Sequence, residues 1–267
     1  MLPFSRATFK EFHFALTLKK PEKEDFLITI HKYSFKVDRF QENYNEKLLS
    51  FGFSRGKNFF VIEKSNIPSN ENNYHNIISQ KISEKERFIA GVAKSVNEWD
   101  KATQFCSLCG KNLLYHNKES AKFCENCNTL YFPKLNPAVI VAIKKENKIL
   151  LTRKKEWKAN RYGIVAGFIE YGETAEEAVI REVFEETALE ITNLQYIASQ
   201  FWPFPYQLMI GFHADYKKGE IKIDSLELEE AKWFDISNLP ILPPEASIAR
   251  YLVDEAIKSI NAKTSLK

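Results

Sequence analysis

The sequence predicts an α+β protein with a β-rich N-terminal part, a cysteine module and a mixed C-terminal domain. Residues 1–100 contain short alternating polar and apolar runs, such as DFLITIHKYSFKV and KNFFVIEK, which are typical of strands. Four cysteines then fall between residues 106 and 127. Beyond residue 134 strands and helices mix without a regular βαβ alternation, which favours α+β over a doubly wound parallel sheet.

The composition is that of an ordinary globular chain. Of the 267 residues 44% are apolar, with 21 Phe and 11 Tyr to fill cores, and the net charge is +3. Mixed Lys and Glu positions give no strong electrostatic case for a nucleic-acid or membrane partner. Because the N-terminal residues lack a signal-peptide pattern and no apolar run reaches 18 residues, we expect a cytoplasmic protein.

The remaining elements follow in chain order. Residues 83–103 read as a helix that begins with a capping box of Ser83 and Glu86, and the aromatic residues before it are expected to be core rather than binding surface. Residues 136–155 read as a hairpin around the turn-like KEN at 145–147. A strand and loop at 163–170, a helix from Ala175 to about Thr187, strands near 194–200 and 207–216, and a helix over 247–260 complete the pattern.

The cysteines form two pairs that suit a metal ion. Cys106 and Cys109 are separated by two residues, as are Cys124 and Cys127, so four thiolates lie on two tight turns. Tetrahedral Zn²⁺ takes this arrangement, and a site filled by four protein ligands is structural. Disulfides and free buried thiols are the alternatives, and the spacing favours zinc.

The helix at 175–187 carries an unusual cluster of acids. Thr174 and Glu177 form its capping box, and at 100° per residue Glu182 and Glu186 share a side with the apolar Val179 and Val183. Carboxylates that face the protein repel one another and lose hydration unless a cation lies among them. The sequence therefore predicts a Mg²⁺ or Mn²⁺ site and phosphoryl chemistry, in preference to a solvated acidic stripe.

Residues 167–189, GFIEYGETAEEAVIREVFEETAL, resemble the Nudix box G-x5-E-x7-R-E-U-x-E-E-x-G-U. Only Ala188 departs from the pattern, where a glycine would permit a positive φ at the helix end, so alanine is expected to cost about 1 kcal/mol or reshape the loop. The matching residues are Gly167, Glu173, Arg181, Glu182, Val183, Glu185, Glu186 and Leu189.

Two further stretches resemble the NADH pyrophosphatase branch of that family. SQFWPFPYQ at 199–207 is similar to the branch signature SQPWPFPxS, with Phe201 and Gln207 in place of Pro and Ser, and FPKLNPAVIVAI at 132–143 is similar to YPRxxPAVIV. The cysteine module precedes both in the expected order. The resemblance implies a Nudix fold, a mixed sheet between helices, over 134–267, preceded by a zinc ribbon at 101–133 and a β-rich domain at 1–100.

The resemblance also implies the activity and the site. NADH or NAD⁺ would be cleaved to nicotinamide mononucleotide and AMP by a homodimeric enzyme with catalytic Mg²⁺ or Mn²⁺ and structural Zn²⁺. Glu182, Glu185 and Glu186, with Glu227 and the carbonyl of Ala166, would hold the catalytic metal, and Glu182 or Glu185 would serve as general base. The residues implied to bind substrate are Phe132, which would reach across the homodimer, Phe168, Gln200, Phe201, Trp202, Pro203, Phe204, Pro205, Tyr206, Gln207 and Ala249.

Other functions remain open at this point. The same chemistry would remove an NAD cap from RNA or cleave ADP-ribose, and a zinc ribbon with an inactive Nudix domain would make a nucleic-acid-binding module. Trp202 and Phe204 could also simply pack a proline-stiffened turn. The intact acidic cluster favours an enzyme, because an inert copy would have no physical reason to keep it.

Overall fold

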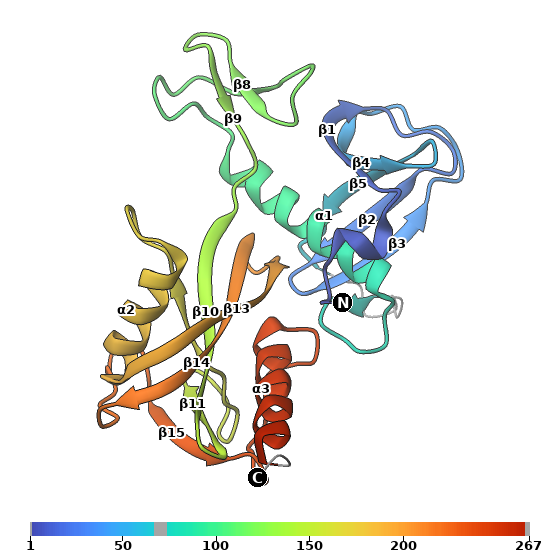
Figure 1. The fold of residues 1–267 in the computed structure, drawn as a ribbon. Coiled ribbons are helices and arrows are strands. Elements are labelled where there is room, and N and C mark those ends of the chain that lie inside the picture. The colour runs from blue at the N-terminus through green and yellow to red at the C-terminus, as the bar shows by residue number, and fades with distance from the viewer. Residues whose placement is uncertain (1, 67–73, 265–267) are drawn as a thin grey trace. The chain divides into compact units, whose positions relative to one another are not determined.

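The chain folds into two compact units (Figure 1). A computed structural model describes residues 2–66 and 74–264. The first unit contains residues 3–135 and 203–206, and the second contains residue 2 with 136–202 and 207–264. No helix among the described residues combines the length and apolarity needed to cross a bilayer.

The first unit contains a six-stranded sheet, as the alternating runs of residues 1–100 predict. Its strand order is β1-β4-β5-β2-β3-β6. Its core is aromatic, and Phe12, Phe51 and Phe60 are each at most 1% exposed. The elements are η1 (Arg6–Phe9), β1 (His13–Lys19), β2 (Phe26–His31), β3 (Ser34–Arg39), β4 (Leu48–Ser54), β5 (Lys57–Glu63), β6 (His75–Asn76) and the helix α1 (Glu84–Ala102).

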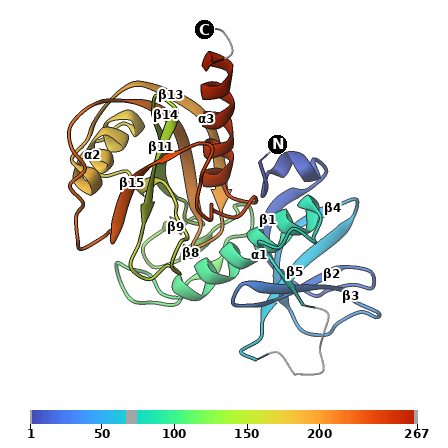
Figure 2. The same ribbon diagram turned by 90° about the horizontal axis from the view of Figure 1, so that it is seen from below.

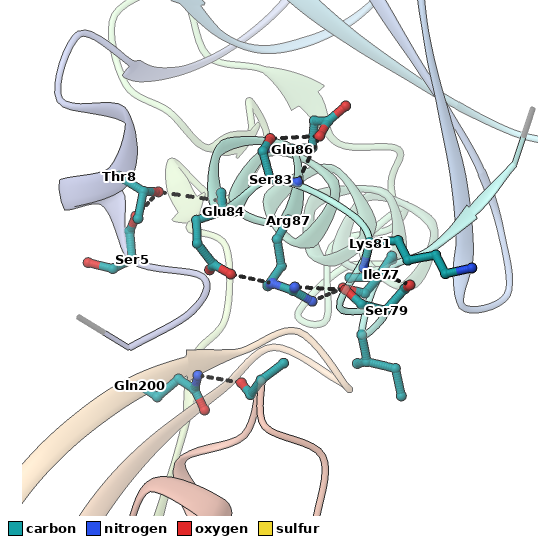
Figure 3. Close-up of polar contacts among 12 residues, drawn as sticks. Ser5, Thr8, Ile77, Ser79, Lys81, Ser83, Glu84, Glu86, Arg87 and Gln200 are labelled. Atoms are coloured by element: carbon teal, nitrogen blue, oxygen red, sulfur yellow. Dashed lines mark hydrogen bonds and ion pairs between the residues drawn. The ribbon is translucent and has the colours of Figure 1, made fainter.

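The helix α1, which packs beside β5 (Figure 2), begins as the sequence predicts. The Ser83 backbone N–H donates to Glu86 at 2.9 Å, and the Glu86 backbone N–H donates to the Ser83 hydroxyl at 3.2 Å. In the next turn Arg87 is 3% exposed, and its guanidinium donates to the carbonyls of Ile77 and Ser79 at 2.7 and 2.8 Å (Figure 3). These bonds satisfy backbone acceptors before the helix and fix the loop there.

The cysteine module forms a three-stranded sheet in the same unit. Its strands are β7 (Leu114–Tyr115), β8 (Lys122–Cys124) and β9 (Thr129–Tyr131). Lys122, only 2% exposed, joins this sheet to the end of α1, because its ammonium donates to the carbonyls of Asp100 and Thr103 at 2.9 and 2.7 Å and contacts the Asp100 carboxylate at 2.8 Å. A cation is favourable at this end of a helix, where carbonyls lack partners.

The second unit is a mixed sheet with strand order β13-β14-β10-β11-β15 and with β12 paired to β10. β10 runs parallel to β14 and antiparallel to β11 and β12. The elements are β10 (Asn136–Lys145), β11 (Lys148–Arg153), β12 (Val165–Phe168), α2 (Ala175–Thr187), β13 (Glu190–Trp202), β14 (Gln207–Lys218), β15 (Glu230–Asp235) and α3 (Ile248–Thr264).

Alternate side chains of β10 pack against different helices. Val139, Val141 and Ile143 join the cluster that contains Val179 and Val183 of α2. Ala138, Ile140 and Ala142 join the cluster that contains Leu252, Val253 and Ala256 of α3. Since successive side chains of a strand point to opposite faces, α2 covers one face of the sheet and α3 the other (Figures 1 and 2). The predicted mixed sheet between helices is confirmed.

The helix α2 begins and ends where the sequence places it. Thr174 and Glu177 exchange capping hydrogen bonds of 2.8 and 3.2 Å. Ala188 ends the helix in the left-handed conformation at φ 58°, the geometry for which the resembling motif uses glycine. The chain therefore keeps the turn despite alanine, at the expected cost of about 1 kcal/mol.

The other predicted elements of this unit are present, and one element was not anticipated. The hairpin turns at residues 145–148, where Lys145 pairs with Lys148, as predicted. β13 and β14 extend beyond the expected limits, and β15 was missed because EAKWFD lies among acidic residues with only Ala231 buried.

Candidate active site

The loop between β12 and α2 is held by one arginine. Arg181 donates to both Glu173 oxygens at 2.5 and 2.9 Å and to the carbonyl of Phe168 at 2.9 Å. The hydrogen bonds from Arg181 lower the pKa of Glu173 to about 2. Arg181 also donates to Glu182 and Glu185 at 2.9 Å each. It therefore partners three acids of the cluster.

Glu182, Glu185 and Glu186 of α2 differ in their environments. The side chain of Glu185 is 58% exposed, whereas that of Glu182 is 12% exposed. Burial raises the pKa of Glu182 despite its hydrogen bond from Arg181. Glu186 is 2% exposed as a residue, so Glu182 and Glu186 face the protein as the helix periodicity predicts, while Glu185 faces solvent.

Glu186 is the group that requires a cation. Neither of its buried carboxylate oxygens has a hydrogen-bond partner among the described residues. Burial raises the pKa of Glu186 to about 8, and the charges of Glu182, Glu227 and Asp224 act in the same direction against the opposing charge of Lys154. Buried carboxylates are normally paired or metal-bound, so this donor set fits a hard divalent cation such as Mg²⁺.

Glu227 and Asp224 come to this cluster from a turn before β15. The backbone N–H of Asp224 donates to the Glu186 carbonyl at 3.3 Å, and the Glu227 backbone N–H donates to the Asp224 carbonyl at 3.2 Å. The structure thus places Glu227 with the acids of α2. Asp224 was not singled out from the sequence, where it is one of several acids in IDSLELEE.

Gly167 makes room for Glu182. A Cβ atom at Gly167 would lie 1.9 Å from the Cδ of Glu182 and 2.0 and 2.2 Å from its carboxylate oxygens. Such distances are far below van der Waals contact, so the absence of a side chain allows the carboxylate to lie against the β12 backbone.

We expect Gly167→Ala to lower kcat about as much as Glu182→Gln while the protein stays folded, because the methyl group displaces the Glu182 carboxylate. Steady-state kinetics and circular dichroism of both variants measure this. Gly56→Ala is a control for folding, because no atom lies within 4 Å of its Cβ position, and its φ of 75°, unlike that of Gly167, makes it the more severe test of the backbone. Normal kcat in Gly167→Ala would contradict the role of Glu182.

A pocket of about 370 Å³ opens beside Glu186 within the second unit. Among the residues singled out from the sequence, Ala166, Phe168, Trp202, Gln207 and Ala249 line it.

Other predicted substrate residues lie elsewhere. Gln200 is 3% exposed. Its amide N–H donates to the Ala246 carbonyl at 2.9 Å and its amide oxygen accepts from the Ile248 N–H at 2.7 Å, so it holds the start of α3 in place. Phe201 is half-buried in β13 and does not line the pocket. Residues 203–206 and Phe132, which is 54% exposed, belong to the first unit.

The pocket also contains residues that the sequence did not single out. Lys154, Trp157, Arg161 and Tyr162 line it from the loop between β11 and β12. No motif marks them, because a basic and aromatic loop after a hairpin is common on protein surfaces.

The four cysteines converge as predicted. Their Sγ atoms all lie within 4.8 Å of one another, and those of Cys109 and Cys124 are 3.6 Å apart. Four sulfurs about 2.3 Å from a tetrahedral ion would be about 3.8 Å apart, so the cluster fits Zn²⁺. Each pair is followed by a residue with positive φ, Gly110 at 72° and Asn128 at 52°, which closes the two similar turns.

Around the cluster, hydrogen bonds fix one sulfur. The Tyr131 hydroxyl lies 3.2 Å from the Cys106 Sγ and accepts from the Ser107 N–H at 3.1 Å. The hydrogen bond with Tyr131 lowers the pKa of Cys106 to about 6, while the hydrogen bond with Cys109 raises the pKa of Cys127 to about 12. The four sulfurs at these distances can therefore be ionised together only with a cation between them.

Comparison with known proteins agrees with this geometry. Residues 134–256 match the family model of the NUDIX domain. A Pseudomonas putida (strain W619) protein described as NAD-capped RNA hydrolase NudC is 42% identical over 166 residues, which are 62% of this chain and 60% of that protein. A Pectobacterium atrosepticum protein of the same description is 41% identical over 169 residues, 63% of this chain and 65% of that protein.

The chain spans about 60% of the length of the curated relatives that it matches. A crystal structure of a NUDIX hydrolase from Nitrosomonas europaea superposes with a TM-score of 0.48 at 22% identity, over 61% of this chain and 93% of that one. The matched residues include β10 to β15, the acidic helix α2 and the pocket. The chain therefore carries a NUDIX domain over residues 134–256.

Proposed function

We propose that the chain hydrolyses the diphosphate bond of NADH or NAD⁺ to nicotinamide mononucleotide and AMP, and that it also removes NAD caps from RNA. The observation that carries this proposal is the environment of Glu186, which is 2% exposed and lines the pocket beside the charges of Glu182 and Glu227. Among the described residues its carboxylate oxygens have no hydrogen-bond partner. The relatives described as NAD-capped RNA hydrolases, at 41–42% identity, support NAD as the substrate class.

The acidic side chains of the site would bind the metal or accept a proton. Glu182, Glu186 and Glu227, with Glu185 and the Ala166 carbonyl, would hold Mg²⁺ or Mn²⁺. Such an ion would supply positive charge that neutralises the diphosphate and lowers the pKa of the attacking water. Glu182 or Glu185 accepts the proton of that water. Arg181 keeps Glu182 in place and anchors the loop through the Phe168 carbonyl.

The remaining parts serve the stability and assembly of the enzyme. Zn²⁺ at the four cysteines holds the ribbon at 101–133 together, between a β-rich domain at 1–100 and the catalytic domain at 134–267. Four thiols in one cluster suit the reducing cytoplasm. Phe132, 54% exposed, is accessible to a second copy of the chain, as a homodimer would require, and there it stacks on substrate together with Phe168.

The test is incubation of the zinc-loaded protein with NADH and Mg²⁺ or Mn²⁺, followed by chromatography of the products. We expect AMP and nicotinamide mononucleotide in equal amounts, and none without the divalent ion. Turnover of ADP-ribose or capped RNA without turnover of NADH would change the substrate assignment. If no diphosphate is cleaved, the chain is a binding module rather than an enzyme.

A further inference from the structure

The loop between β11 and β12 places three side chains of complementary chemistry on the pocket wall. Lys154, Trp157 and Arg161 all line the pocket that contains Glu186. We propose that they form a mononucleotide subsite, in which the Trp157 indole stacks on the ring of one half of a dinucleotide and the two cations bind its phosphate. This inference rests on the proposed function and assigns residues that determine which half of the substrate is held here.

The indole of Trp157 is held against a bare backbone. A Cβ atom at Gly163 would lie 2.7 and 2.8 Å from the Cη2 and Cζ3 atoms of the indole. Gly163 is itself fixed, since it exchanges backbone hydrogen bonds of 2.8 and 3.0 Å with Thr152. Trp157 is half-buried and still lines the pocket. A rigid aromatic surface of this kind suits base stacking, which contributes roughly 1–3 kcal/mol per base.

Within residues 2–66 and 74–264, neither Lys154 nor Arg161 makes a side-chain hydrogen bond or an ion pair. The neighbouring Arg153, by contrast, has carboxylates of Glu229 and Glu230 at 3.3 and 3.9 Å. Arg153, which does not line the pocket, is thus paired, whereas Lys154 and Arg161 on the pocket wall have no such partner among the described residues. An unpaired ammonium and guanidinium in one cavity attract an anion such as phosphate.

Lys154 and Glu186 line the same pocket. A phosphate bound by Lys154 would therefore share the cavity with one of the metal-binding acids. The volume of about 370 Å³ is at the lower end of the range for small-molecule sites, which suits one mononucleotide half. Phe168 and Ala249 complete the lining.

The experiment measures the binding of AMP and of nicotinamide mononucleotide, the two products, to the zinc-loaded protein with Mg²⁺ by calorimetry. We expect one of them to bind more tightly and so identify the half that is held. Trp157→Ala should weaken the binding of that nucleotide by about 5-fold to 100-fold, the range that a lost stacking contact gives. The affinity of Trp157→Phe should stay within about 3-fold of the unaltered chain. Lys154→Met should weaken it by about 10-fold.

Lys155→Met is the matched control, because Lys155 is exposed and does not line the pocket. It should bind like the unaltered chain. Thermal unfolding checks each variant, and Lys154→Met carries the test if Trp157→Ala does not fold. Equal affinity of Trp157→Ala, Lys154→Met and the unaltered chain overturns the proposal, as does failure of the unaltered chain to bind either nucleotide.

Kinetics separate this inference from the proposed function. If NADH is hydrolysed, Trp157→Ala and Lys154→Met should raise KM more than they lower kcat, since they remove contacts to the held half. An active enzyme with unchanged KM in both variants refutes the subsite and leaves the proposed function intact. Nucleotide binding that is weakened in both variants, without NADH hydrolysis by the unaltered chain, refutes the proposed function and leaves the subsite intact.

Discussion

Glu186→Gln is expected to lower kcat by roughly 10²-fold to 10³-fold while the fold is retained, an effect similar to the loss of one well-placed electrostatic group in an active site. The amide has nearly the same shape as the carboxylate but no charge with which to hold a divalent ion beside Glu182. Steady-state kinetics with NADH and a titration of Mn²⁺ binding measure the change. Glu176→Gln is the control, since Glu176 is an exposed residue of the first turn of α2. Unaltered turnover in Glu186→Gln would contradict the assignment of the metal site to α2.

In the metal-free protein, Glu186→Gln should improve stability at high pH, whereas it lowers kcat in the metal-loaded enzyme. Burial raises the pKa of Glu186 to about 8 in the fold, from the value of 4.5 of an exposed glutamate in the unfolded chain. The folded state therefore binds the proton more tightly, and the contribution is complete below about pH 4.5 and lost as the pH rises to 8. Metal-free protein should lose unfolding free energy across that interval. Glu186→Gln should flatten the profile and Mg²⁺ should restore stability at pH 8, as denaturant titrations can show.

Cys124→Ser is expected to release the zinc and unfold the ribbon. Cys124 is fully buried at the end of β8, and structural Zn²⁺ contributes an apparent 10–16 kcal/mol or so to small folds. A serine hydroxyl there neither ionises at neutral pH nor has a partner for its buried oxygen. Zinc content by mass spectrometry and protease cleavage between residues 104 and 131 measure the loss.

His116→Gln is the matched control for the ribbon. His116 lies between the cysteine pairs, but its Nδ1 accepts from the Glu119 N–H at 2.9 Å and it is outside the sulfur cluster. It should keep a full complement of zinc. Zinc loss in His116→Gln, or zinc retention in Cys124→Ser, would contradict the four-cysteine assignment.

The parts of the fold that the sequence predicted are those governed by short-range rules. Both capping boxes, the end of α2 at Thr187 and the burial of Glu182 and Glu186 follow from helix geometry and spacing. The cysteine cluster follows from spacing as well. β15 was missed because its burial comes from pairing with β11, and a six-residue segment with one buried side chain carries too little periodicity.

The site was predictable only where a motif exists. The acids of α2 were identified because their mutual repulsion requires a cation. The sequence suggested no structural role for Gln200, since its hydrogen bonds to the start of α3 are visible only when β13 and α3 are placed together. Asp224 and Lys154 likewise reach Glu186 from loops distant in sequence. Long-range packing, which no local pattern encodes, sets the electrostatics of that carboxylate.

Lys122 gives the first unit a mechanical property. Its buried ammonium binds two carbonyls at the end of α1 and lies two residues before Cys124, with the Trp99 and Tyr115 rings 5.5 and 5.4 Å away. Ribbon and helix are thereby joined through one buried charge, whose contacts with Asp100 and Thr103 are lost if the sheet comes apart. Amide protons in the last turns of α1 should therefore exchange with solvent in step with those of the ribbon, as one cooperative unit.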